Sequence, residues 1–181
     1  MHFVVGLGSG EHADKQVRLY HVDGTLVHTF EGHTAAVYAV AVTPDGQHII
    51  SGSDDHLVKV WSVATKSLVS TCECGGERVL ALAVMPGGAR FVSCSSDRTA
   101  KLWTLHDGPL ERTFAVGSAV DCIAALPDGV HFVVGTSVGF YYNNEVRLYH
   151  VDGTLVHTFK GHNGYVAVSY THLTLPTILL V

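Results

Sequence analysis

Short apolar runs recur along most of this chain, and each run is closed by turn residues. The first complete series consists of Val37 to Val42, the turn Pro44-Asp45-Gly46, Ile49 to Asp55, and Val58 to Trp61. Runs of this kind, rich in β-branched and aromatic residues and bounded by Gly, Pro and Asp, predict antiparallel strands joined by tight turns. The series returns at Val79 to Trp103 and, in a longer form, at Val120 to Tyr149.

The repeats have a fixed period. Trp61 and Trp103 are 42 residues apart, and Pro44, Pro86 and Pro127 follow each other at steps of 42 and 41. A period of this size with four strands per repeat is typical of a β-propeller, in which each repeat forms one blade. The sequence therefore predicts an all-β fold of four-stranded antiparallel blades. Within the complete repeats we expect strands near 37–42, 48–52, 57–63, 67–72, 79–84, 90–94, 99–105, 110–114, 119–125, 131–135, 145–151 and 154–158.

The first complete repeat carries four residues with a distinctive spacing, namely His33, Ser51, Asp55 and Trp61. In this pattern the chain resembles the WD40-repeat family over about residues 1–167. The resemblance implies a structural tetrad in which a His from a Gly-His turn, a Ser on the second strand, an Asp in the next turn and a Trp on the third strand are joined by hydrogen bonds.

The later repeats keep only part of this set. The second keeps Ser93, Asp97 and Trp103 but has Gly75 in place of His, and the third has Tyr149 for the Trp and Val134 at the Ser position. No Asp follows Trp61, Trp103 or Tyr149, so the Trp-Asp dipeptide that gives the family its name is absent. A Ser, a His and an Asp could also form a hydrolase triad. The partial recurrence of the set, and the need of a buried indole N–H for an acceptor, favour a structural role.

Repeat boundaries divide the chain into a partial blade and complete blades. We expect a partial blade at 1–30, blades at 31–73, 74–115 and 116–159, the first strand of a further blade at 160–167, and a tail at 168–181. Since propellers of this kind usually close with about seven blades of about 40–45 residues, the expected shape is an open arc of about half a ring. The alternative is a four-bladed closure, in which Tyr165 to Val168 pairs with the strand that begins at His2.

The two ends of the repeat region are near copies of each other. Residues 17–30 and 146–159 share the sequence VRLYHVDGTLVHTF, and residues 2–6 match residues 131–135. The decapeptide at 168–177, VSYTHLTLPT, departs from the repeat and resembles the translation of a transposase-type sequencing-library adapter. This predicts that 168–181 is a non-native tail and that the natural chain continues beyond it. A chance natural segment is the competing interpretation.

Charge and cysteine content narrow the class of partner. The net charge is −5 with 11 basic residues, which argues against binding nucleic acid or anionic membranes. Cys94 and Cys122 lie in apolar runs, and Cys72 and Cys74 lack the second pair that a zinc site would need. We therefore expect no disulfide framework, metal or cofactor, and an intracellular, cytoplasmic location.

The sequence contains no nucleophile elbow, Walker loop or kinase catalytic loop, which predicts a protein that is not an enzyme. The function we expect is a scaffold or adaptor that binds proteins or peptides, and whose own full-length chain supplies the missing blades. The alternative is the regulatory propeller of a larger enzyme, such as a kinase, peptidase or NTPase. Family-like spacing implies a binding face formed by Tyr38, Asp54, Arg78, Leu80, Ser96, Asp121 and Tyr165.

Overall fold

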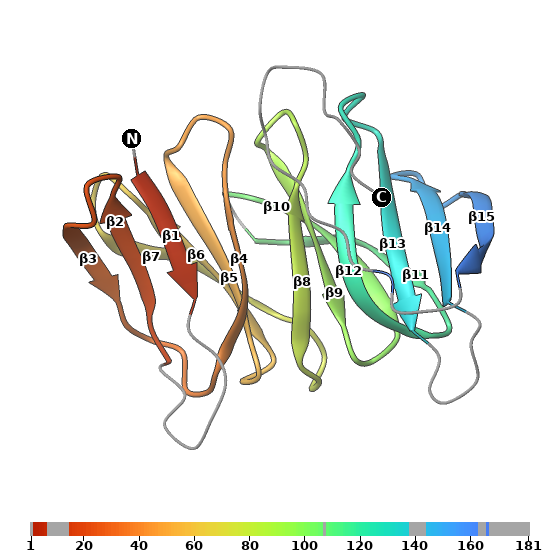
Figure 1. Ribbon diagram of the computed structural model, residues 1–181, viewed down its shortest axis with the longest axis horizontal. Helices are drawn as coiled ribbons and strands as arrows, with labels where there is room; N and C mark the ends of the chain where they lie inside the picture. Colours follow the sequence, from red (N-terminus) through yellow and green to blue (C-terminus); the bar gives the residue numbers. More distant parts are fainter. Residues whose placement is uncertain (1, 7–14, 107, 138–143, 163–165, 167–181) are drawn as a thin grey trace.

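The computed structural model describes residues 2–6, 15–106, 108–137, 144–162 and 166. Its strands form four antiparallel sheets that stand side by side like blades in an open arc (Figure 1). In every sheet the strands follow chain order, so each blade is a simple meander. The described residues contain no helix. The predicted all-β architecture of an open partial propeller is confirmed.

The first sheet has three strands and the others have four. It consists of β1 (His2–Gly6), β2 (Val17–His21) and β3 (Leu26–Phe30). The second consists of β4 (Val37–Val42), β5 (His48–Ser53), β6 (Leu57–Ser62) and β7 (Ser67–Glu73). The third consists of β8 (Val79–Val84), β9 (Arg90–Ser95), β10 (Thr99–Thr104) and β11 (Leu110–Ala115). The fourth consists of β12 (Ala119–Ala125), β13 (His131–Ser137), β14 (Asn144–His150) and β15 (Leu155–His162).

The strand ends agree closely with those expected from the sequence, except at the end of the last blade. There β15 continues to His162, because Asn144 pairs with His162 beyond a register shift in the ladder. The four-bladed closure is not observed, since the arc is open (Figure 1). Val166, the described residue of that segment, lies against the last blade, where its carbonyl oxygen accepts a hydrogen bond from the Cys122 thiol at 3.1 Å.

In the second and fourth sheets, a tight turn with an Asp at the same place connects the first strand to the second. In the turn after β4, the Asp45 carboxylate accepts a hydrogen bond from the backbone N–H of Gln47 at 2.9 Å. The backbone of Gly46 has a φ of 69°, a left-handed conformation that glycine adopts without the penalty of a side chain. Asp128 plays the same part after β12, where it accepts hydrogen bonds from the N–H groups of Val130 and His131.

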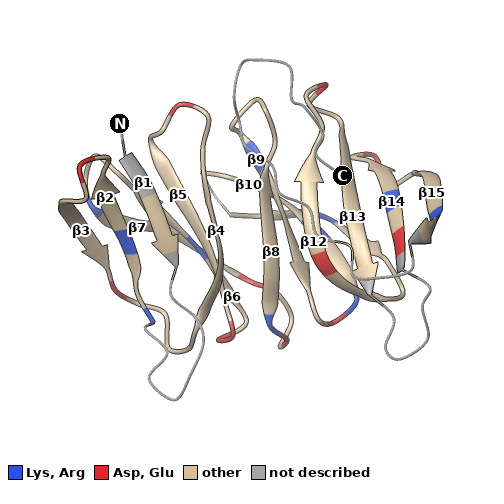
Figure 2. Cartoon of the chain, viewed as in Figure 1, with Lys and Arg blue, Asp and Glu red and all other residues tan. Residues whose placement is uncertain are grey.

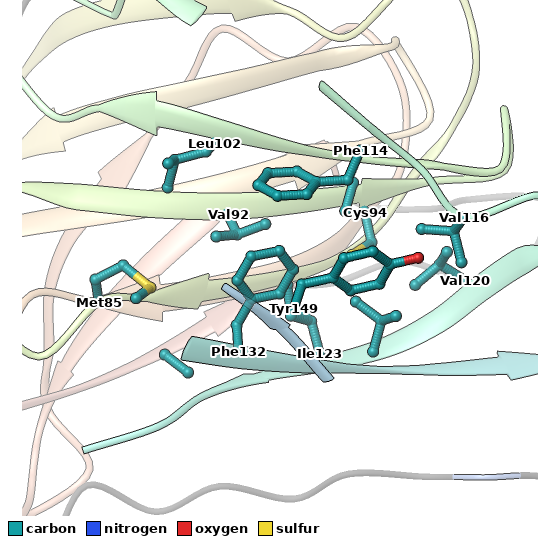
Figure 3. Packing of buried hydrophobic residues seen from close by; sticks show 13 residues of the cluster. Met85, Val92, Cys94, Leu102, Phe114, Val116, Val120, Ile123, Phe132 and Tyr149 are labelled. Carbon is teal, nitrogen blue, oxygen red and sulfur yellow. The ribbon is translucent and has the colours of Figure 1, made fainter. Parts of the chain in front are cut away.

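The hydrophobic core lies between blades. Each four-stranded blade presents a large residue on its second strand and an aromatic residue on its third to the sheet that precedes it. Figure 3 shows the contact between the last two blades, where Phe132 and Tyr149 meet Leu102 and Phe114. The Phe114 and Phe132 rings lie edge to face with centroids 4.9 Å apart. Burial of such rings between blades, rather than within one sheet, holds the arc together.

Candidate functional site

Four side chains from separate parts of the first complete blade meet in one hydrogen-bonded chain. Trp61 on β6 donates its indole N–H to the Ser51 hydroxyl oxygen on β5 at 2.8 Å. Ser51 also lies 2.8 Å from Nε2 of His33, and Nδ1 of His33 lies 2.8 Å from the Asp55 carboxylate. The structure therefore brings together the four residues that the sequence singled out.

The donor directions follow from the chemistry of the groups. Because Ser51 accepts from the indole, its hydroxyl hydrogen is available to donate to Nε2 of His33. A carboxylate only accepts, so Nδ1 of His33 donates to Asp55, and the imidazole is neutral. Burial lowers the pKa of His33 below its usual 6.5, and this outweighs the raising effect of Asp55. Ser51 is 0% exposed and its oxygen already accepts the indole N–H, so a substrate has no access to the hydroxyl, and the arrangement suits stabilisation of the blade.

The Gly-His turn is shaped to place the imidazole. Gly32 has a φ of 146°, and a Cβ built there would lie 3.3 Å from the Trp61 ring. The turn therefore passes so close to the indole that glycine is favoured. Two residues after Gly32, the backbone N–H of Thr34 donates to the Asp55 carboxylate at 2.9 Å. This bond links the Gly-His turn to the turn between β5 and β6.

The second complete blade, formed by β8 to β11, has a cysteine and a lysine where the first complete blade has the histidine, and the sequence did not lead us to expect this. Trp103 donates its indole N–H to Ser93 at 2.8 Å, as in the first blade. Ser93 corresponds to Ser51. In place of the histidine ring, the Cys74 sulfur lies 3.7 Å from the Ser93 hydroxyl oxygen. Where His33 would bond Asp55, the Lys101 ammonium donates to Asp97 at 2.7 Å. Lys101 also donates to the Cys74 carbonyl oxygen at 2.8 Å, so the buried cation has several acceptors.

The signal for this lysine was present in the sequence. Lys59, Lys101 and Arg147 stand opposite the Ser position in the ladders of the three complete blades, paired with Ser51, Ser93 and Val134. A basic residue in the middle of a buried third strand requires an acceptor nearby. In the last blade Arg147 donates to Glu145 at 2.8 Å and to the Val116 carbonyl oxygen.

The candidate binding residues occupy one structural position in successive blades. Tyr38, Leu80 and Asp121 each lie where the ladder between the first and second strands shifts by one residue. Such a β-bulge re-aims a side chain away from the regular ladder. Tyr38 is 42% exposed, Asp121 is exposed and Leu80 is half-buried. The three strands that carry them, β4, β8 and β12, are neighbours along the inner side of the arc.

An ion pair joins the loops of two neighbouring blades beside these bulges. Arg78, just before β8, contacts the Asp54 carboxylate through Nε at 2.7 Å, and its side chain is 57% exposed. Ser96, in the corresponding loop of the third sheet, donates to the carboxylate of Glu77 at 3.2 Å. Asp54, Arg78 and Ser96 were predicted from the sequence, whereas Glu77 was not. Tyr165, the last of the predicted set, lies outside the described residues.

Outside these groups, the relevant features of the described residues are their thiols, their metal-ligating side chains and their helix content. The four cysteines are buried and no disulfide joins them, and burial raises the pKa of Cys72 and Cys74 to about 11. Among the residues that the structure describes, no group of three or more His, Cys, Asp or Glu is placed to hold a metal ion. The same part of the chain has no helix that is long and apolar enough to cross a membrane. Acidic and basic positions are interspersed along the arc (Figure 2).

Comparison with known proteins identifies the repeats. The family described as "WD domain, G-beta repeat" matches residues 24–62 and 66–104. Proteins named "Ribosome biogenesis protein BOP1 homolog" match over short segments. The one from Drosophila grimshawi is 48% identical over 44 residues, and the one from Leishmania braziliensis is 46% identical over 46 residues. These segments cover 24% and 25% of this chain, and 6% of the length of each relative.

Proposed function

This chain carries WD40 repeats at residues 24–62 and 66–104, and we propose that it serves as a non-enzymatic scaffold that binds proteins or peptides. The observation that carries the proposal is the row of bulge residues Tyr38, Leu80 and Asp121 on three adjacent inner strands, bordered by Arg78. We name these four residues, together with Asp54 and Ser96, the inner face.

The composition of the inner face suits recognition of a polypeptide. An exposed tyrosine and an arginine are the residue types that contribute most to protein interfaces, because they combine apolar area with hydrogen bonding. Asp54 contacts Arg78 through Nε, so the rest of the guanidinium remains available to a partner. The strands beneath are fixed by interblade packing, which lowers the conformational entropy lost on binding.

The curated relatives support the repeat architecture rather than a particular process. The matched segment of 44 residues has the length of one repeat, which is about 40–45 residues. Ribosome biogenesis, the process in the relatives' name, is therefore not carried over to this chain. We also propose an intracellular location, because no disulfide joins the four cysteines. The other blades of a longer chain are included among the partners.

A peptide selection tests the inner face. Peptides selected from a random displayed library against the full chain should bind the Tyr38→Ala, Arg78→Ala double variant at least about tenfold more weakly, a loss of about 1.4 kcal/mol. The melting temperature should change little, because Tyr38 is 42% exposed and the Arg78 side chain 57%. Leu68→Ala is the matched control, since Leu68 is 47% exposed on the outer strand β7.

Three results would contradict the proposal. The first is a library that yields no peptide binder. The second is full binding by the double variant with its fold intact, which would move the site away from the inner face. The third is an equal loss of binding in Leu68→Ala.

A further inference from the structure

Two cavities lie between the turns that join the first and second strands of the last three sheets. These turns, residues 43–47, 85–89 and 126–130, stand next to one another at one edge of the arc (Figure 1). The cavity between the first and second turns has a volume of about 220 Å³, and the one between the second and third about 480 Å³. Asp54 and Ser96 of the inner face lie in turns at the opposite edge of the blades, so the cavities belong to a separate surface.

The middle turn leaves the space between the two cavities open. The outer turns have the sequences Pro44-Asp45-Gly46 and Pro127-Asp128-Gly129, whereas the middle one is Pro86-Gly87-Gly88. Figure 2 shows an acidic residue in each outer turn and none in the middle turn. Gly87 lines both cavities, and a Cβ built there would meet nothing within 4 Å. We name the two cavities, together with Gly87 between them, the turn groove.

The smaller cavity of the turn groove is acidic. Asp45, His48 and His106 line it, and its lining contains no Lys or Arg. Hydrogen bonds from the Thr43 hydroxyl and from the backbone N–H of Gln47 lower the pKa of Asp45 below 3.8, so the carboxylate is charged at neutral pH. Both bonds end at Oδ1, and the residue is exposed, so Oδ2 can accept a hydrogen bond from a ligand. A charged carboxylate with no basic residue in its cavity attracts a cation.

The walls of the smaller cavity suit a cation on an apolar stem. Pro44 and Leu105 line it beside the polar groups. The rings of His48 and His106, from neighbouring blades, meet edge to face with centroids 5.6 Å apart. Lys and Arg side chains lay their alkyl stems along apolar surface and keep their charged ends at polar atoms. The planar guanidinium of Arg also stacks on aromatic rings. A basic side chain therefore fits this cavity.

The larger cavity calls for a different side chain, because its charged groups already have partners. Arg90 donates to the Gly129 carbonyl oxygen at 3.3 Å, and the Asp128 carboxylate lies 2.7 Å from Nδ1 of His131. The other side chains that line the cavity are apolar, namely Met85, Pro86, Ala89 and Pro127. An apolar side chain can fill such a cavity without displacing a hydrogen bond.

We propose that the turn groove binds an extended segment of a partner protein, with a Lys or Arg side chain beside Asp45 and an apolar side chain in the larger cavity. The segment crosses the middle turn at Gly87, where no side chain stands in its way. This site does not depend on the inner face, because the two surfaces lie at opposite edges of the blades.

A peptide selection on a chain with a disabled inner face tests the turn groove. The bait is the full chain with Tyr38→Ala and Arg78→Ala, so failure of the inner face does not affect the result. Peptides selected from a random displayed library should carry a Lys or Arg near an apolar residue. In isothermal titration calorimetry the synthesised peptides should bind at least about fivefold more weakly when Asp45→Asn is added to the bait. The turn itself is retained, because Asn keeps the oxygen that accepts from Gln47.

Two further variants sharpen the test. Gly87→Asn places a neutral side chain between the cavities, in a turn that tolerates Asn, and should also weaken binding. Asp152→Asn is the matched control, because Asp152 accepts from the N–H of Thr154 at 2.9 Å as Asp45 accepts from Gln47, in the distant turn between β14 and β15. It makes the same change in charge and should bind like the bait.

Four results would overturn the proposal. They are a library that yields no binder, selected peptides without a basic residue, full binding by both groove variants with their fold intact, and an equal loss in Asp152→Asn. The last would show that net charge alone attracts the peptides. If Asp45→Asn fails to fold by circular dichroism, His106→Ala replaces it, since His106 is exposed, and it should weaken binding of the same peptides.

Discussion

At the scale of single residues, the same hydrogen-bonding demand is met in two ways. Each Trp needs an acceptor for its indole N–H, and Ser51 and Ser93 supply it at 2.8 Å. The turn Asp then needs a donor, which is an imidazole in one blade and the Lys101 ammonium in the next. Burial tends to raise the pKa of Asp97, but the hydrogen bonds from Lys101 and Thr99 outweigh this effect. The pKa therefore lies below the usual 3.8, and the carboxylate is charged and paired. The loss of a histidine is thus compensated within the blade.

The neutral state of His33 predicts a dependence of stability on pH. The folded pKa lies below 6.5, so below about pH 6.5 the unfolded chain binds a proton at this residue that the folded chain does not. The stabilising contribution of His33 should therefore fall as the pH falls from 6.5. Between about pH 7.5 and about pH 5.5, the difference in free energy of unfolding between wild type and His33→Gln should narrow by at most about 1.4 kcal/mol.

Urea unfolding at the two pH values, on dilute protein, measures this difference. Asp55 does not interfere, because its pKa is lowered from 3.8 and its contribution is lost only in stronger acid. His157→Gln, at an exposed residue of β15, is the control and should leave the pH dependence as in the wild type. A difference between wild type and His33→Gln that stays constant or widens at acid pH would contradict the neutral assignment.

At the scale of strands and blades, the sequence was sufficient to predict the fold, because the local turn and strand signals agree with the antiparallel pairing of successive strands. The turns Pro44-Asp45-Gly46 and Leu126 to Gly129 mark where the chain reverses, and the apolar runs between turns set strand length. The spacing of His33, Ser51, Asp55 and Trp61 was enough to place these residues in one blade, whereas their stabilising role stays a prediction.

Contacts between blades could not be predicted in the same way. The ion pair of Arg78 with Asp54 depends on how two loops of different sheets approach each other, which no local pattern encodes. The bond from Lys101 to the Cys74 carbonyl oxygen was missed for a similar reason, because Cys74 lies on the loop before the blade, far from Lys101 in the sequence. The binding role of the inner face therefore remains a proposal.

Gly52 offers a test of how closely two blades pack. A Cβ at Gly52 would lie 2.5 Å from a methyl carbon of Val79 on the next blade, which is too short for a normal contact. Gly52→Ala should therefore push the second and third sheets apart and destabilise the chain by about 1–3 kcal/mol. Thermal or urea unfolding measures the loss. Gly87→Ala is the control, because a Cβ there meets nothing within 4 Å.

A second substitution shows whether Val79 is the cause. Val79→Ala removes the methyl groups that the new Cβ would meet, so the Gly52→Ala, Val79→Ala double variant should be more stable than the sum of the single effects predicts. Strictly additive losses would indicate that Gly52 is required for its backbone alone.

At the scale of the whole molecule, the arc behaves as a row of units that contact only their neighbours. The third sheet packs between two blades through separate clusters, with Phe91 and Trp103 on one side and Leu102 and Phe114 on the other. Among the described residues, each outer sheet packs against a neighbouring sheet on one side. Stability in such arrays is approximately the sum of each unit and its interfaces, so the ends open most readily. Of the two ends, the first sheet has one strand fewer.

The repeated segment allows this ranking to be measured with an internal control. Residues 17–30 and 146–159 have the same sequence, so their amide hydrogens have nearly the same intrinsic exchange rates, and any difference in protection reflects the surroundings. We expect residues 17–30 to exchange faster. In the first sheet β1 pairs only with β2 among the described strands, whereas β13 is held between β12 and β14.

Hydrogen exchange with mass spectrometry can separate the two copies. Peptides that begin at Gln16 and at Glu145 differ in mass although the residues that follow are identical. The measurement is made on dilute wild-type chain, in which the two copies keep the same sequence, and the slowest exchange should occur in β9 and β10 at the centre of the arc. Equal protection in the two copies would mean that the missing strand costs the first sheet nothing. Faster exchange at 146–159 would mean that the cover supplied by Trp61 outweighs the fourth strand, and the ranking of the two ends would be reversed.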